Sequence, residues 1–161
     1  MGYADLRDWL KQVEGFGEVL RLNGADWNLE IGGLCEIIVR EAKKNVPAIL
    51  FDDIRGYPKG TRALFAMLSS VKRLALTVNL PLEYGGMMDF VRAFHEKIRD
   101  LQIIPPVTVT QGPVAENVME GDRIDLYKFP SPFHHEKDGG RYFGTAHVVL
   151  TQHPDEGWYN L

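Results

Sequence analysis

Two consecutive prolines, Pro105 and Pro106, place the strongest constraint on how this chain folds. Proline fixes φ and lacks a backbone N–H, so the pair fits neither a helix interior nor a central strand. Helical and strand patterns alternate before this point, whereas strand patterns follow it. We therefore expect a domain boundary here, with an α/β N-terminal domain over residues 1–104 and the start of a β-rich domain over residues 105–161.

The first domain shows apolar residues at helical spacing in four places. Helices are expected over 6–13 after a cap at Asp5, over 31–39, from a cap at Ser69 or Ser70 through Leu76, and over 87–99. The expected apolar face of the second helix is Ile31, Leu34, Cys35, Ile38 and Val39. That of the last helix is Met88, Val91, Phe94 and Ile98. Strands are expected over 18–22, 47–51 and 63–68, the middle one buried on both faces.

The second domain shows β-branched and aromatic runs separated by glycine, proline and aspartate. Strands are expected over 107–110, 124–127 and 141–152, and from Trp158 onward. The turn at 154–157 would join the last two strands as a β-hairpin. Because the second arm has barely begun at Leu161, we expect an open sheet edge that a downstream segment or a partner covers.

Composition excludes several classes of protein. The net charge is −4 and the basic residues form no stripe, which argues against nucleic-acid binding. No apolar run approaches the roughly 20 residues that span a bilayer, so we expect a cytoplasmic protein without membrane contact. The single cysteine, Cys35, excludes an internal disulfide and a multi-thiolate metal site, and its helical surroundings favour a buried small apolar residue.

Several motifs resemble the UbiD-like family of reversible decarboxylases, which use prenylated flavin mononucleotide (prenylated FMN). They are DGGRY at 138–142, Thr145, PDEG at 154–157 and the W-x-N of Trp158 and Asn160. Near the N-terminus DLRDWL at 5–10, WNLEIG at 27–32 and PAILF at 47–51 are similar to the same family. The resemblance covers the whole chain and implies that the second domain is the beginning of a flavin-binding split β-barrel.

Asn160 is the first candidate site residue. Its amide oxygen is a hard, neutral ligand that suits Mn²⁺ or Mg²⁺. The resemblance implies that this asparagine helps to hold a divalent metal that bridges the protein to the flavin phosphate, and K⁺ is a further candidate ion. The alternative is an ordinary edge-strand asparagine bonded to its own backbone.

Thr145 is the second candidate, for a place beside the flavin. If the hairpin loop has an odd number of residues, Thr145 shares a sheet face with odd-numbered residues of the second arm and Asn160 faces the other side. The family pattern places an arginine five residues after the asparagine, beyond Leu161, and it would share the face of Thr145. The alternative is a threonine that fills an ordinary strand position.

Other polar residues favour structural interpretations. His134 and His135 would point in opposite directions in an extended segment, which argues against a metal cluster over 134–138. His147 is interpreted as a half-buried strand histidine. The pairs at 52–53 and 155–156 are expected to be solvated turn acids, and the glycine pairs at 32–33 and 85–86 to serve packing or capping.

The resemblance implies the N-terminal part of a decarboxylase that acts on an aromatic or α,β-unsaturated carboxylic acid. The family's catalytic glutamates and arginine lie downstream of the asparagine, so no catalytic residue is assigned here. We expect this chain alone to be inactive and to hold flavin weakly, and a full-length relative to form a homo-oligomer. The alternatives are a non-catalytic subunit or assembly module that pairs its open sheet edge with a partner chain, and a metal hydrolase that uses His134 and His135.

Overall fold

The computed structural model describes residues 2–105, 107–144 and 148–160. Its first helix, α1 (Leu6–Gly15), begins where the Asp5 carboxylate accepts a hydrogen bond from the Asp8 N–H at 2.8 Å. The helix buries Trp9, Leu10 and Val13. It ends before Gly17, whose φ of +72° is readily adopted by glycine. The predicted cap and helix are confirmed.

A three-stranded sheet forms the centre of the first domain. The strands β1 (Val19–Asn23), β2 (Ala48–Asp52) and β3 (Arg62–Phe65) lie in the order β1-β2-β3. β1 runs parallel to β2, with Val19 opposite Ala48, and β3 runs antiparallel to it, with Phe65 opposite Ile49. β3 ends at Phe65, three residues before the predicted end at residue 68, because Ala66 adopts a left-handed φ of +53° that breaks the ladder.

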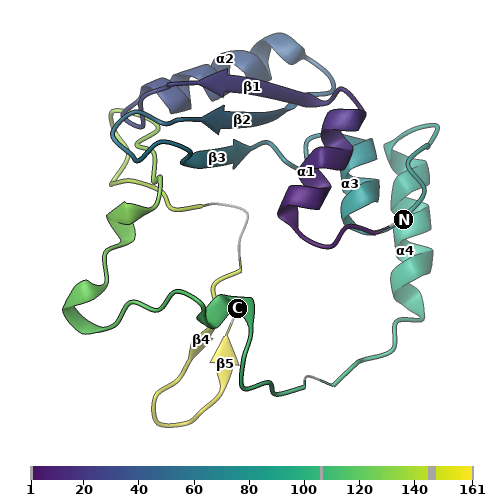
Figure 1. Ribbon diagram of the computed structural model, residues 1–161. Helices are drawn as coiled ribbons and strands as arrows, with labels where there is room; N and C mark the ends of the chain where they lie inside the picture. Colours follow the sequence, from purple (N-terminus) through teal and green to yellow (C-terminus); the bar gives the residue numbers. More distant parts are fainter. Residues whose placement is uncertain (1, 106, 145–147, 161) are drawn as a thin grey trace.

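The central strand β2 is buried on both faces, as its continuous apolar run predicts. Leu50 packs with Trp9, Leu10 and Val13 of α1 and with Leu76 of α3 (Val71–Thr77). On the opposite face Ile49 and Phe51 belong to the cluster that contains Ile31 of α2 (Glu30–Ala42). Figure 1 shows α2 on one side of the sheet and α1 and α3 on the other. The first domain is thus a small three-layer α/β unit.

The predicted apolar faces of two helices need correction. On α2, Ile31 is buried and Leu34, Cys35 and Ile38 pack against the core, whereas Val39 is exposed. On α4 (Met87–Arg99), Phe90 is buried, and the predicted face residues Met88, Val91 and Ile98 are exposed. α4 lies against α3, and its Lys97 donates to the carbonyls of Val78 and Asn79 just beyond the end of α3. Phe90 packs edge-on against Tyr84 and stacks on Phe94, a predicted face residue that is half-buried.

Beyond residue 100 most predicted strands are absent from the described residues. Residues 107–110 form no ladder, and 124–127 overlaps the 3₁₀ helix η3 (Leu126–Lys128), which follows η1 (Pro113–Ala115) and η2 (Gly121–Arg123). Of the strand predicted over 141–152, β4 (Thr151–Gln152) pairs with β5 (Tyr159–Asn160). A strand exists only where a neighbour completes its ladder, and β-propensity alone does not supply one.

Large apolar side chains in this second region are exposed. Ile103, Ile104 and Val107 are 95%, 87% and 83% exposed, and Val114 is 93% exposed. In contrast, the apolar side chains of the two core clusters between residues 9 and 76 are buried. No helix among the described residues is both long enough and apolar enough to span a membrane.

Candidate functional site

Of the two candidate site residues, Asn160 is among the described residues and lies in the β4–β5 hairpin. Asn160 pairs with Thr151 and Tyr159 pairs with Gln152 in an antiparallel ladder, which confirms the predicted hairpin over a shorter length. Both strands are exposed, so the Asn160 side chain is accessible. An accessible amide oxygen fits the role of one ligand to a hard cation.

The hairpin turn has several internal contacts. The His153 N–H donates to the Trp158 carbonyl at 2.9 Å, and the His153 Nδ1 accepts from the Glu156 N–H at 3.1 Å. The His153 ring stacks on the Trp158 indole with 5.7 Å between centroids. Gly157 supplies a φ of +73° in this turn. These contacts set the register that places Asn160.

The observed register of the hairpin differs from the odd-loop register that the prediction assumed. Because His153 bonds to Trp158, the loop between them spans 154–157, and each cross-strand pair joins an odd-numbered residue to an even-numbered one. Asn160 therefore shares a face with the odd-numbered Thr151, not with even-numbered residues of the first arm. Thr145 and His147 themselves lie outside the described residues.

The described residues do not form a complete metal site. Among them, no three His, Cys, Asp or Glu side chains gather in a way that would hold a metal ion. Mg²⁺ and Ca²⁺ ordinarily take six or more oxygen ligands, and Mn²⁺ favours the same hard oxygens, so a single amide oxygen is only one ligand of the several that such a site needs.

His134 and His135 have protein partners that account for their positions. The His134 ring lies edge-on to Phe65 with 5.7 Å between centroids, and burial lowers its pKa. His135 lies 3.6 Å from the Asp138 carboxylate and 3.9 Å from that of Glu36. Asp138 also accepts a hydrogen bond from the His135 N–H at 3.0 Å, which closes the turn that follows the pair.

Cys35 packs against the cluster around Ile49 and Phe51. Burial raises the pKa of its thiol to about 11, so the thiol stays protonated at neutral pH. This environment agrees with the predicted structural role.

An aromatic and arginine cluster was not anticipated from the sequence. Arg141, which belongs to the DGGRY motif, lies over the Trp27 indole at 3.8 Å from its centroid. Tyr57 and Tyr127 flank the same guanidinium at 5.8 and 4.8 Å. We call Trp27, Tyr57 and Tyr127 the aromatic box. Local periodicity gives no signal for it because its members come from three distant segments.

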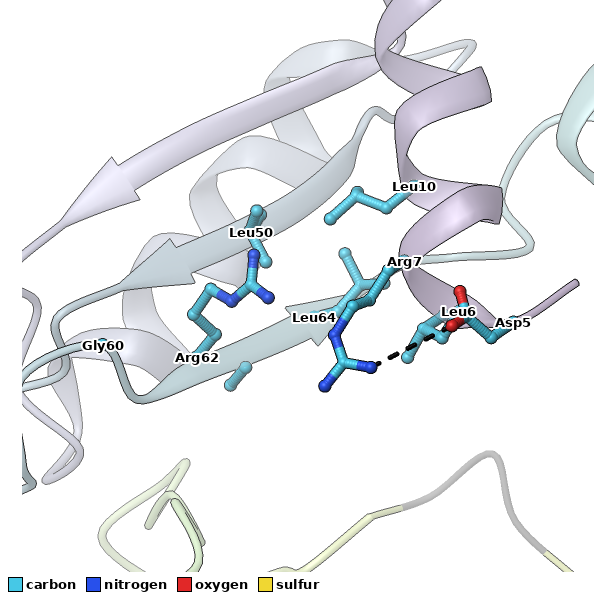
Figure 2. Close-up of a pocket in the computed structure, with 9 residues that line it drawn as sticks. Asp5, Leu6, Arg7, Leu10, Leu50, Gly60, Arg62 and Leu64 are labelled. Carbon is cyan, nitrogen blue, oxygen red and sulfur yellow. Dashed lines mark ion pairs between the residues drawn. The ribbon is translucent and has the colours of Figure 1, made fainter. Parts of the chain in front are cut away.

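A pocket of about 450 Å³ lies between α1 and β3 (Figure 2). Its apolar floor includes Leu10, Leu50 and Leu64, and Arg7 and Arg62 line it as well. Arg7 has a loose ion pair with Asp5 at 4.0 Å, which Figure 2 marks. Neither Asn160 nor any other residue of the hairpin lines this pocket, so it is separate from the candidate site.

Two family models match this chain. The 3-octaprenyl-4-hydroxybenzoate carboxy-lyase N-terminal domain matches residues 10–84, and the Rift-related domain of the same carboxy-lyase matches residues 106–161. Pyrrole-2-carboxylic acid decarboxylase of Pseudomonas aeruginosa is 38% identical over 164 residues. Ferulic acid decarboxylase 1 of Saccharomyces cerevisiae is 25% identical over 169 residues. These alignments cover 96% and 97% of this chain but 32% of each relative, so the chain spans about a third of their length.

Solved structures show the same relationship. The vanillic acid decarboxylase of Sedimentibacter hydroxybenzoicus in its open form matches with a TM-score of 0.71 and 27% identity, over 88% of this chain and 30% of that chain. The UbiD-class enzyme HmfF of Pelotomaculum thermopropionicum, an evolved dimeric form in complex with prFMN, matches with a TM-score of 0.67 and 29% identity, over 96% and 34%. The α/β fold and these matches place the chain among relatives of carboxy-lyases. The chain belongs to the UbiD-like family.

Proposed function

We propose that this chain is the N-terminal part of a UbiD-like decarboxylase that acts on an aromatic or α,β-unsaturated carboxylic acid with prenylated FMN. The relatives named above are decarboxylases of aromatic or unsaturated acids by name, and one UbiD-class neighbour is a complex with prFMN. The observation that carries the proposal is the β4–β5 hairpin, which displays Asn160 within the region that the Rift-related model matches.

In this proposal Asn160 and Thr145 belong to the cofactor site. Asn160 supplies a neutral oxygen to Mn²⁺ or Mg²⁺, and the further ligands lie outside the described residues. When bound, the flavin would carry the decarboxylation chemistry, and the protein would bind and orient it. The division into two domains, 1–104 and 105–161, is part of this proposal, and the separate matches of the two family models to residues 10–84 and 106–161 support it.

This chain by itself is proposed to be inactive. The cross-strand neighbour of Asn160 is Thr151, which carries no carboxylate that could hold or transfer a proton. A full-length relative is proposed to be a homo-oligomer, and the HmfF neighbour was solved as a dimeric form. Measurable decarboxylase turnover by the isolated chain would contradict the proposed inactivity, and flavin titration tests the cofactor assignment.

The second candidate function is a non-catalytic assembly module. It is favoured by the two-stranded β4–β5 sheet, whose outer edges find no further strand among the described residues, and by the exposed Ile103, Ile104 and Val107. The reading frame after the codon for Leu161 separates the two candidates. An Asn-x-x-x-x-Arg pattern that starts at Asn160 supports the decarboxylase, and a stop codon supports the module.

A further inference from the structure

The Arg141 side chain connects the region after residue 104 to the first domain through contacts with two aromatic residues. Its guanidinium lies over Trp27, which precedes α2, and beside Tyr57, which follows β2. Both aromatic residues belong to the first domain, whereas Arg141 lies in the second region. A guanidinium over an aromatic face gains cation–π attraction, most strongly over tryptophan.

Hydrogen bonds fix the same guanidinium at two points. The Arg141 Nε donates to the Ser131 carbonyl at 2.7 Å, and Nη2 donates to the Tyr57 hydroxyl. The Tyr57 hydroxyl also accepts from the Ser131 N–H at 3.2 Å. This geometry needs the planar fork of arginine, because a lysine ammonium cannot stack on Trp27 and reach both acceptors at once.

The backbone near Arg141 also contacts the first domain directly. Phe133 donates to the Trp27 carbonyl at 3.0 Å and accepts from the Leu29 N–H at 2.8 Å. Gly56 has a φ of +86°, and a Cβ there would lie 2.9 Å from two atoms of the Trp27 indole. The glycine therefore leaves room for the ring on which Arg141 lies.

We propose that Arg141 is a positioning residue for the cofactor part of the chain, an inference that rests on the proposed function. Arg141 belongs to the segment that leads into the β4–β5 hairpin, and its contacts with Trp27 and Tyr57 hold that segment on the first domain. The aromatic box therefore ties the chain that enters the cofactor region to the first domain. Flavin affinity then depends on side chains that do not touch the flavin.

Hydrogen exchange on the 161-residue chain without flavin tests the contact itself. We expect Arg141→Met to speed exchange of the Phe133 and Tyr142 amides about tenfold or more, because both donate hydrogen bonds within the seated segment. The Trp9 amide in α1 is the internal reference. Arg141→Lys should restore part of the protection, and Arg92→Met, at an exposed arginine of α4, should change nothing. Unchanged exchange in Arg141→Met would overturn the proposal.

Titration of the same variants with prenylated FMN and MnCl₂ tests the positioning role. We expect Arg141→Met to weaken binding about tenfold and Arg141→Lys to weaken it less. Faster exchange with unchanged flavin affinity would overturn the positioning role and leave a packing contact. If the unaltered chain binds no flavin, both the proposed function and the positioning role fail, whereas the exchange result still decides whether the contact exists.

Discussion

Gly32 of α2 and the backbone of His134 are in direct contact. A Cβ at Gly32 would lie 2.3 Å from the His134 carbonyl oxygen and 2.7 Å from its Cα, both backbone atoms. The 131–135 segment can therefore pack directly against α2 because residue 32 has no side chain. The predicted packing role of this glycine is confirmed.

Replacing Gly32 by alanine should destabilise the chain by about 1–3 kcal/mol, since the added methyl forces the seated segment away from α2. Gly33→Ala is the matched control, because a Cβ there meets nothing within 4 Å. It should stabilise the helix by up to about 1 kcal/mol, the usual difference between alanine and glycine in a helix interior. Urea unfolding measures both changes. Equal effects of the two substitutions would contradict the contact.

Arg73 and Glu18 form the principal buried ion pair of the first domain. The Arg73 side chain is fully buried and lies 2.7 Å from the Glu18 carboxylate, and it also donates to the Met67 carbonyl at 2.8 Å. We expect Arg73→Met to lower the free energy of unfolding by about 2–3 kcal/mol, below the upper range for a buried pair because Glu18 is partly exposed. Arg92→Met should cost less than about 0.5 kcal/mol. A similar cost for both variants would refute the role of this pair.

His134 makes stability depend on pH. Burial lowers its pKa in the folded chain below the usual value of about 6.5, against the opposing effect of the Asp138 carboxylate, while the neighbouring His135 lowers it further. The unfolded chain therefore binds more protons near pH 6 than the folded chain. Stability should fall as the pH is lowered from 7 through 6.5 toward the folded-state pKa.

Chemical denaturation at a series of pH values between about 7 and 5.5 measures this dependence. His134→Gln removes the titrating ring and should flatten the curve in that window. His95→Gln, at an exposed position of α4, serves as the control and should leave the slope unchanged. A slope that persists in His134→Gln would assign the dependence to another group.

Cys35 reports the integrity of the core around α2. Since burial raises its thiol pKa to about 11 from an ordinary value near 9, the thiolate fraction falls by about a hundredfold in the folded chain. A thiolate of higher pKa is also more nucleophilic, so alkylation by iodoacetamide at pH 8 should be slower than in urea by about tenfold to a hundredfold. The chain has a single cysteine, so the reaction reports this site alone. Fast alkylation of the folded chain would show that the thiol is accessible.

The sequence predicts the elements whose signal is local. The Asp5 cap of α1, the Ser70 cap of α3 and the apolar run of β2 each appear where expected. The buried face of α4 was mispredicted, because helical spacing does not tell which of two apolar stripes on a helix contacts its neighbour.

Long-range pairing explains the remaining differences. The strands expected over 107–110 and 124–127 lack a partner ladder among the described residues, and propensity does not create one. The sequence left open the length of the hairpin loop, and with it which residues of the two arms share a face. The hydrogen bond from the His153 N–H to the Trp158 carbonyl sets the loop at residues 154–157. The role proposed for Thr145 stays a prediction.

Titration of this chain with prenylated FMN, followed by flavin fluorescence with and without Mn²⁺, tests the central claim most directly. The account predicts weak binding that needs the metal and is lost in Asn160→Ala, because that substitution removes the exposed amide oxygen on β5. Asn117→Ala, at an exposed asparagine outside the hairpin, should bind as the unaltered chain does. Binding that is indifferent to Mn²⁺ and to Asn160, or no binding at all, would contradict the proposed cofactor site.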